Sequence, residues 1–295
     1  MTQQSSHSYH GLYINLDRSP ERRRSIEEQL AALGLQDVYV RFPAVDGKRI
    51  PFPQSPLKPG EIGVFLSHRD ALEAAKAKGQ SVHILEDDAL LTKHVPSVIE
   101  DAIRGDLFDR FDLLFTDILV NCQVSLLKKL SAAFEEIELP PSGTLRLRDL
   151  KLMDLAQVSF ASTQSYVVGA KSVEKVIALY AQEIANGPKA PIDIFLRRQV
   201  LKGKLRAACT FPFITTGRLE EVIASTVADQ GEHKLHPSLM VIAALRYLFF
   251  VDRDLDYAQR LLDAATKGPR KRTGRHHALM MQATEFVMSP DFEEF

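Results

Sequence analysis

The stretch Val82-His83-Ile84-Leu85-Glu86-Asp87-Asp88 decides how the rest of the chain is interpreted, because an apolar run ends abruptly at three consecutive carboxylates. The run is too short for a helix and predicts a buried strand. Charged groups at the end of a strand must be solvated, paired or bound to a cation. In an α/β protein, ligands bind outside the carboxyl ends of the parallel strands, so acids at this point are available as metal ligands beside a phosphate.

The segments that precede this stretch alternate between strand and helix patterns. Apolar runs mark the strands, glycines end the helices, and prolines at positions 51, 53, 56 and 59 mark a loop. The predicted elements are a strand over 12–16, a helix over 20–33, a strand over 38–42, the proline-rich loop and a helix over 60–78. This alternation indicates an α/β fold with a mainly parallel, doubly wound sheet.

The same alternation continues after the three acids and then gives way to helices. Between residues 117 and 165 the pattern weakens, and we interpret this segment as an insertion that shapes an acceptor site. From His236 onward the chain is predicted to be all-helical. The predicted elements are helices at 96–104 and 126–134, strands at 112–116, 145–147, 166–168 and 205–211, and a helix that Pro191 opens.

Length, charge and cysteine content exclude several classes of protein. The 295-residue chain has a formal net charge of -1, which argues against a nucleic-acid-binding domain. Cys122 and Cys209 lie far apart in sequence, so we expect no zinc site or disulfide framework and a reducing, cytoplasmic compartment. Residues 1–10 lack the pattern of a secretion signal, and the apolar run 239–251 is shorter than the roughly 20 residues that span a bilayer.

These patterns predict three parts of the chain. Residues 1–10 form a disordered polar N-terminus, residues 11–225 form the α/β domain, and residues 226–295 form a helical C-terminal extension. The extension carries a basic segment from Lys267 to Arg272, followed by Arg275-His276-His277. A solvated linker is the favoured interpretation of this segment, and peripheral contact with an anionic membrane surface is the alternative.

The three acids form the first candidate site. If Glu86 and Asp88 continue the two-residue period of the strand, they project to one face while Asp87 points to the other. Mg²⁺ and Mn²⁺ prefer oxygen ligands and commonly combine one or two carboxylates with substrate phosphates. The alternative is a surface loop whose acids are merely hydrated.

Two further segments could contribute to a site. Residues 15–24 lead from the first strand into an arginine-rich helix N-terminus, which suits an anion, although a capped helix with a basic face explains them equally well. Residues 60–68 begin a helix that carries Ser67 and His68. Because adjacent helical residues point in different directions, a Ser-His nucleophile pair is not expected, and a lone histidine is more often structural than a ligand.

Together these segments resemble glycosyltransferase family 25, the bacterial lipopolysaccharide or lipooligosaccharide glycosyltransferases related to collagen galactosyltransferases. The resemblance covers about residues 11–215 and depends on the order of several motifs. These are Tyr13-Ile14-Asn15-Leu16-Asp17-Arg18 with Glu21-Arg22-Arg23, Phe42-Pro43-Ala44-Val45-Asp46-Gly47, Gly60 to His68, and Leu85-Glu86-Asp87-Asp88, with weaker similarity at Ser165 to Val168 and at Pro191-Ile192-Asp193. Four linked motifs are far more specific than any one of them.

The resemblance implies a Rossmann-like GT-A fold and a metal-dependent, inverting transfer of a sugar from a UDP-sugar, with galactose favoured, to a saccharide or glycolipid acceptor. It implies Mn²⁺ or Mg²⁺ at Asp88 and Glu86. Asp193 becomes the first candidate for the general base, and Asp117, at the end of another predicted strand, is the second. The residues implied to bind the donor are Asn15, Asp17, Arg22, Asp46, Ser67, His68, Glu86 and Asp87.

The chain departs from the family pattern at two points, and two other functions stay open. Val64 replaces an expected cysteine, and Thr116-Asp117 replaces an expected leucine-glycine pair, which affects the acceptor side. One alternative function is a nucleotide-sugar-binding adaptor of an envelope-assembly complex with little catalysis. The other is a metal-dependent phosphohydrolase, although the chain shows no recognisable nucleophile motif.

Overall fold

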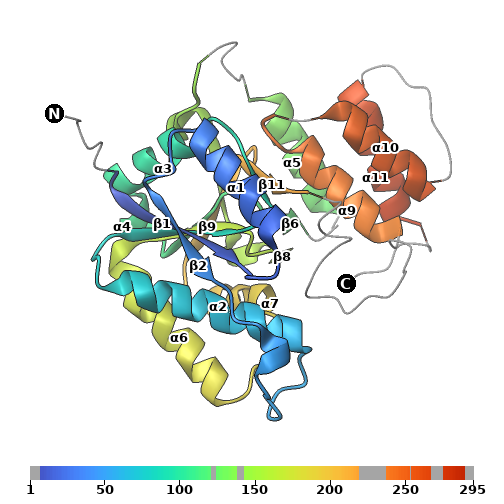
Figure 1. Ribbon diagram of the computed structural model, residues 1–295. Coiled ribbons are helices and arrows are strands. Elements are labelled where there is room, and N and C mark those ends of the chain that lie inside the picture. Colours follow the sequence, from blue (N-terminus) through green and yellow to red (C-terminus); the bar gives the residue numbers. More distant parts are fainter. Residues whose placement is uncertain are drawn as a thin grey trace.

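The computed structural model of the chain describes residues 7–120, 124–137, 143–218, 237–252, 254–266 and 275–289. A seven-stranded sheet lies at its centre (Figure 1). Its strands are β1 (Tyr9–Asn15), β2 (Tyr39–Pro43), β3 (Ser81–Glu86), β5 (Leu113–Phe115), β7 (Lys151–Asp154), β9 (Ser165–Val168) and β10 (Ala207–Phe211). They are arranged in the order β2-β1-β3-β9-β5-β10-β7.

The sheet is mixed and mainly parallel. β1 pairs in parallel with β2 and β3, and β5 pairs in parallel with β10. β9 lies antiparallel between β3 and β5, and β7 is antiparallel to β10. The predicted α/β fold is therefore confirmed, and it differs from a fully parallel doubly wound sheet only at β9 and β7.

Helices cover both faces of the sheet because successive strand residues point to opposite sides. Ile84 belongs to the core cluster that also contains residues of α2 (Pro59–Lys76), α6 (Val173–Ala185) and α7 (Ile192–Leu201). Leu85 belongs to a second cluster with residues of α1 (Pro20–Ala32), α3 (Val95–Arg104) and α4 (Leu107–Arg110). This alternation also directs the acids at the end of β3 toward different helices.

The predicted C-terminal helical extension is present as α9 (Pro237–Leu248), α10 (Leu255–Thr266) and α11 (Arg275–Val287). These helices lie beside α5 (Val124–Glu135) at one side of the sheet (Figure 1). Their apolar side chains belong to the same hydrophobic core as Ile84, so the extension packs directly on the α/β domain. The predicted domain boundary at residues 225 and 226 lies outside the described residues.

Two short pairs of strands and four 3-10 turns complete the described elements. β4 (Ala89–Leu91) pairs with β11 (Thr215–Gly217), and β6 (Leu119–Val120) pairs with β8 (Phe160–Ala161), both antiparallel. The 3-10 turns are η1 (Gly47–Arg49), η2 (Leu147–Asp149), η3 (Leu155–Gln157) and η4 (Ala170–Ser172). The strand predicted over 145–147 is wrong, because Leu147 begins η2.

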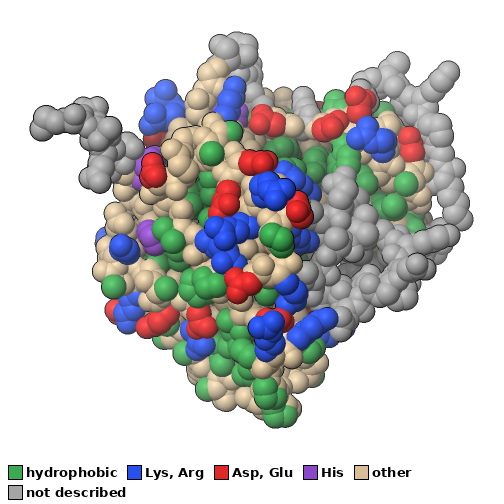
Figure 2. All heavy atoms as spheres, viewed as in Figure 1, with side chains coloured by type: hydrophobic (Ala, Val, Ile, Leu, Met, Phe, Trp, Pro, Cys, Tyr) green, Lys and Arg blue, Asp and Glu red, His purple; other side chains and the backbone are tan. Residues whose placement is uncertain are grey.

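The N-terminal residues and the surface bear on two further expectations. β1 begins at Tyr9, and Ser8 donates hydrogen bonds to Glu100, so the end of the segment predicted to be disordered is held against α3. Lys, Arg, Asp and Glu side chains are intermixed over the face in Figure 2. The basic segment from Lys267 to Arg272 lies outside the described residues. None of the described helices is long and apolar enough to cross a membrane.

Candidate functional site

The three acids lie where the sequence predicts them, at the carboxyl end of β3. Glu86 is the last residue of that strand, and Asp87 and Asp88 form the turn into β4. Ile14 pairs with Glu86 across the parallel strands β1 and β3, so Asn15 ends β1 at the same edge of the sheet. This edge is the usual ligand-binding position in α/β proteins.

Asp87 is held on the α1 side of the sheet. Its Oδ2 accepts a hydrogen bond of 2.7 Å from Asn15 Nδ2, and its Oδ1 lies 3.3 Å from Arg22 Nη1. Burial raises the pKa of the Asp87 carboxyl, although Asn15 and Arg22 both stabilise its charged form. The carboxylate therefore joins the strand end to the first turn of α1.

Glu86 points to the opposite face, toward α2. Its Oε1 accepts a hydrogen bond of 2.8 Å from Thr163 Oγ1 and lies 3.5 Å from His68 Nε2. The other ring nitrogen of His68 is 2.9 Å from the Tyr166 hydroxyl. Burial opposes ionisation of Glu86, but the contacts with His68 and Thr163 outweigh it and lower the pKa of this carboxyl.

Asp88 lies between the other groups of the site. Its Oδ1 accepts a hydrogen bond of 2.5 Å from Gln164 Nε2. Burial, reinforced by the negative charge of Glu86, raises the pKa of Asp88 to about 7. Glu86 and Asp88 are therefore two neighbouring buried carboxylates, of which the first has a lowered pKa and the second a raised one.

A first cleft opens beside these acids and takes its lining entirely from residues 14–88. Three of its side chains, Arg18, Arg22 and Lys48, are cations, and Arg18 and Arg22 pair there with Asp46 and Asp87. The lining residues are Ile14, Leu16, Arg18, Arg22, Ala44, Val45, Asp46, Gly47, Lys48, Gly60, Gly63, Val64, Ser67, His68, Glu86, Asp87 and Asp88.

Two glycines set the wall of the first cleft. A Cβ at Gly63 would lie 2.6 Å from the carbonyl oxygen of Val45, and a Cβ at Gly47 would lie 1.7 Å from that of Pro59. The loop after β2 therefore packs directly on the backbone of α2, which side chains would prevent. This close contact explains why two segments with separate motifs meet in one wall.

A second cleft adjoins the first one and takes its lining from residues 61–246. Val64, Glu86 and Asp88 line both clefts, so the two spaces meet at the acids. The remaining lining residues are Glu61, Leu119, Ser162, Thr163, Gln164, Pro191, Ile192, Asp193 and Arg246.

Asp193 lies in the second cleft, in the first turn of α7. Its Oδ2 accepts a hydrogen bond of 3.1 Å from the Ser162 backbone N-H, and its Oδ1 accepts one of 2.7 Å from the Ile194 N-H. Ser162 has a φ of 83°, a left-handed conformation that is rare for serine. The local backbone thus orients the Asp193 carboxylate toward this cleft.

Four predicted site residues act mainly as supports. Asp17 pairs with Arg41 at 2.5 Å and is absent from both cleft linings. Asp46 pairs with Arg18, and its Oδ1 caps η1. Ser67 Oγ accepts from the Val45 N-H and donates to the Gly63 carbonyl, whereas Asn15 reaches the site only through Asp87. Of the four, Asp46 and Ser67 line the first cleft and Asn15 and Asp17 line neither cleft, and the donor contacts of all four stay a prediction.

Sequence reasoning missed Arg246 and Gln164. Arg246 extends from α9 and pairs with the buried Asp117, and its Nη2 also donates to Gln164 Oε1. Asp117, the second candidate base, is 1% exposed and lines neither cleft. Neither Arg246 nor Gln164 lies within one of the motifs, and only tertiary packing brings the two residues to the acids.

The carboxylates of the site supply some, but not all, of the oxygen ligands that a hard divalent cation needs. Among the described residues no group of three His, Cys, Asp or Glu side chains is placed to hold a metal by itself. Asp88 and Glu86 do supply carboxylate oxygens, and a cation there would offset both the burial and the charge of Glu86, which together raise the pKa of Asp88. Such a cation would need further oxygens, which Mg²⁺ and Mn²⁺ commonly take from substrate phosphates.

Fold and site together define a class of protein. A mainly parallel sheet flanked by helices, with carboxylates at a strand end where two clefts meet, is a GT-A-like architecture. The chain belongs to glycosyltransferase family 25: the profile of that family, described as an LPS biosynthesis protein, matches residues 9–196. The resemblance found in the motifs is thereby confirmed.

Curated relatives give the same family name over shorter segments. The chain is 35% identical over 122 residues to a glycosyltransferase 25 family member from Aedes aegypti, which is 34% of this chain and 19% of the relative. Family members from Drosophila pseudoobscura pseudoobscura and Anopheles gambiae are each 37% identical, over 98 and 102 residues. These two alignments cover 27% and 28% of this chain but only 15% and 16% of the relatives.

Proposed function

We propose that the protein is a metal-dependent, inverting glycosyltransferase that moves a sugar from a UDP-sugar to a saccharide or glycolipid acceptor of a cell-surface glycan. Galactose is the favoured sugar, and lipopolysaccharide or lipooligosaccharide biosynthesis on the cytoplasmic side of the membrane is the favoured setting. The observation that carries the proposal is the meeting of two clefts at Glu86 and Asp88. A transferase must hold a donor and an acceptor on either side of the reacting carbon.

The first cleft suits the donor. Arg18, Arg22 and Lys48 bring positive charge to a space that also begins beside the N-terminal turn of α1, and a nucleoside diphosphate carries the complementary charge. Asp88 and Glu86 are the residues that would hold the cation, Mn²⁺ or Mg²⁺. A bound cation would stabilise the negative charge that develops on the leaving diphosphate.

The second cleft suits the acceptor and its base. A carboxylate base must lie within hydrogen-bond reach of the acceptor hydroxyl, and Asp193 lines this cleft with both oxygens oriented by backbone N-H groups. Asp117 instead serves as the counter-ion of Arg246. The acceptor oxygen bonds to the sugar carbon as the bond from that carbon to the diphosphate oxygen breaks, and the hydroxyl proton passes to Asp193.

A screen of nucleotide sugars tests the proposal. Each donor is added to the protein with Mn²⁺ or Mg²⁺, and thermal stabilisation is measured, because a ligand that binds only the folded state raises its stability. Donors that bind are then incubated with saccharide acceptors, and released nucleoside diphosphate and glycosylated product are quantified. We expect UDP-galactose to stabilise the protein and to yield both products.

Three outcomes would contradict the proposal in different ways. Stabilisation without release of nucleoside diphosphate would favour a binding adaptor. Release of free phosphate in place of nucleoside diphosphate would favour a phosphohydrolase. Equal turnover with a chelator and with metal would remove the cation from the proposal and leave the transfer itself intact.

A further inference from the structure

Arg246 is part of the C-terminal extension, yet its side chain reaches the acids of the site. It belongs to α9, beyond the residues 9–196 that match the family profile. Its guanidinium lines the second cleft together with Glu86 and Asp88. An arginine that lies outside the family-matched region thus takes part in the reaction centre that we propose.

The environment of Arg246 is unusual for a cation. The residue is only 6% exposed, and its Nε has no hydrogen-bond partner. Its charge is balanced by Asp117, whose Oδ1 is also buried without a partner. A buried ion pair of this kind is poor evidence of a gain in stability, because both groups lose hydration. Its presence beside the acids instead suggests a role in arranging them.

That role follows from Gln164. The Nη2 group of Arg246 donates both to Asp117 Oδ2 and to Gln164 Oε1. Because the Arg246 guanidinium contacts the amide oxygen of Gln164, the amide nitrogen points the other way and donates to Asp88 Oδ1 at 2.5 Å. The two neighbours therefore fix one orientation of an amide whose oxygen and nitrogen would otherwise be interchangeable.

The backbone on both sides of Gln164 and Arg246 holds this arrangement in place. The carbonyl of Gln164 accepts from the Glu86 N-H at 2.8 Å. Gly217 lies against the pair so closely that a Cβ there would be 2.5 Å from Gln164 Oε1 and 2.8 Å from Arg246 Nη1. Tyr247, the next residue of α9, donates from its hydroxyl to the Gly217 carbonyl at 3.2 Å.

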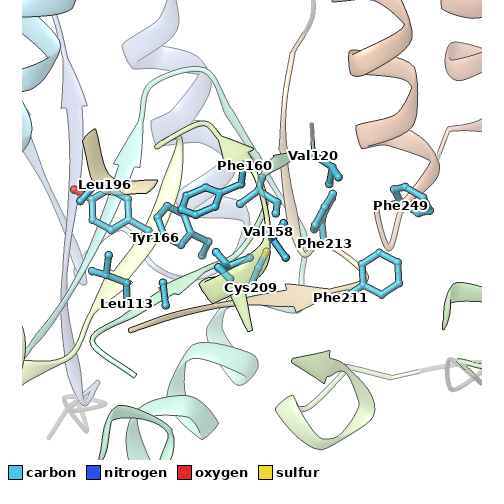
Figure 3. Packing of buried hydrophobic residues seen from close by; sticks show 14 of the residues in the cluster. Leu113, Val120, Val158, Phe160, Tyr166, Leu196, Cys209, Phe211, Phe213 and Phe249 are labelled. Atoms are coloured by element: carbon cyan, nitrogen blue, oxygen red, sulfur yellow. The ribbon is translucent and has the colours of Figure 1, made fainter. Parts of the chain in front are cut away.

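Aromatic packing anchors the end of α9 to the sheet. The Phe213 N-H donates to the Phe249 carbonyl, and the Val251 N-H donates to the Phe213 carbonyl, each at 2.9 Å. The rings of Phe249 and Phe211 are 5.4 Å apart, and Figure 3 shows Phe249 beside Phe211 and Phe213. These contacts hold the chain directly after the end of α9, three residues beyond Arg246, against the strand β10 and the residues that follow it.

We propose that Arg246 is a positioning residue of the transfer site, through which the C-terminal extension holds the Gln164 amide in the orientation that donates to Asp88. This inference rests on the proposed function. Arg246 acts on the reaction through Gln164 and not by contact with the donor. Its loss therefore lowers the rate of transfer, and donor binding in the first cleft stays nearly intact.

Steady-state kinetics of four variants in the full chain test this inference. Arg246→Met is combined with Asp117→Asn, because removing Arg246 alone leaves a buried carboxylate unpaired and strongly destabilises the folded chain. Gln164→Met removes the amide, and the triple variant removes all three groups. Arg197→Met is the matched control, since Arg197 is a partly buried arginine that bonds Ser159 and the Phe160 carbonyl and lines neither cleft.

We expect kcat to fall about tenfold in the Arg246→Met/Asp117→Asn variant and in Gln164→Met, with the donor KM within about twofold. The triple variant should be no slower than either, because groups that act in one chain of contacts are not additive. Arg197→Met should keep kcat within about threefold.

Two results would overturn the inference. Unchanged kcat in the Arg246→Met/Asp117→Asn variant, or losses that multiply in the triple variant, would show that Arg246 does not act through Gln164. These results leave the proposed function standing, because the wild-type chain still transfers sugar. A wild-type chain without transfer to any acceptor would instead refute the proposed function and this inference together.

Discussion

The two clefts meet at the same acids but are built from different parts of the chain. The first cleft is lined by residues 14–88, a continuous run of strand, helix and loop. The second cleft collects residues 61–246, including one from the C-terminal extension. The first cleft is thus determined largely by local segments, whereas the second one depends on contacts between distant parts of the chain.

This difference matches the proposal that the first cleft binds the donor and the second cleft binds the acceptor. Transferases that use the same kind of donor need donor clefts of similar structure. Transferases that act on different acceptors need acceptor clefts that differ from one another. The family profile covers the whole first cleft but ends before Arg246 in the second one. Asp88 lines both clefts, so changes there test them together, and changes elsewhere should separate them.

The largest effect is expected at Asp88, where the clefts meet. We expect Asp88→Asn to lower transfer about 1000-fold, because it removes a carboxylate from the proposed cation site. The folded protein should be no less stable at pH 8. The raised pKa of Asp88 means that its ionisation in the folded state opposes folding above the unfolded pKa of about 4. Kinetics and urea unfolding measure the two effects.

Asp109→Asn is the control for that change, because Asp109 is an exposed carboxylate that pairs with Lys171 away from both clefts. It should leave the rate of transfer within about twofold. Full activity of Asp88→Asn would contradict the assignment of Asp88 to the point where donor and acceptor meet.

A smaller effect, confined to the second cleft, is expected at Asp193. Asp193→Asn removes the proposed base while an amide oxygen can still accept the Ser162 hydrogen bond, so kcat should fall about 100-fold. Donor affinity, measured by calorimetry, should change less than twofold. Asp154→Asn is the matched control, since Asp154 caps η3 and asparagine caps equally well. Lost donor binding with unchanged kcat would place Asp193 on the donor side.

The sequence predicted the first cleft well because its signals are local. A strand that ends in acids, a helix that begins after a strand and a pair of glycines each mark their own positions, and Glu86, Asp87 and Arg22 do come together. Among the residues that line the second cleft but not the first, only Asp193 was predicted as a site residue. Arg246 and Gln164 are 82 residues apart, and neither an arginine within an apolar run nor a glutamine within a polar one marks a site by itself.

Short segments in the insertion were also beyond local reasoning. The alternating residues 145–147 predicted a strand, but Leu145 is buried and Arg146 pairs with Asp101 of α3. Tertiary contacts therefore override a two-residue period that is only three residues long. The direction of β9 is a similar case, because alternation indicates a strand without indicating its orientation.

The wall of the first cleft is tested by Gly63→Ala. Helix propensity alone would make this change stabilising by about 1 kcal/mol. A Cβ would lie 2.6 Å from the Val45 carbonyl oxygen, so we expect the free energy of unfolding to fall by about 2 kcal/mol and donor affinity to weaken. Urea unfolding of Ala74→Gly, at an exposed position of α2, measures the difference in helix propensity between alanine and glycine without the close contact. A stabilised Gly63→Ala variant would refute the close contact.

The smallest effect is expected at His83, which lies on β3 within the sheet that supports both clefts. His83 is fully buried between Tyr39 and Ser165, and burial lowers its pKa to about 3. The unfolded chain therefore binds a proton near pH 6.5 that the folded chain does not bind. This contribution to stability is complete above pH 6.5 and is lost as pH falls toward 3.

Lowering the pH from 6.5 to 5.5 should accordingly cost about 1 kcal/mol of the free energy of unfolding through His83 alone. Urea unfolding of the wild-type chain and of His83→Gln between pH 5 and 7 measures this, and the variant should show a shallower dependence on pH. Because His83 supports the sheet and lines neither cleft, kcat at pH 7 should change little in the folded variant. An equally steep dependence in both proteins would mean that the acid sensitivity arises elsewhere, with the carboxylates of the clefts as the next groups to substitute.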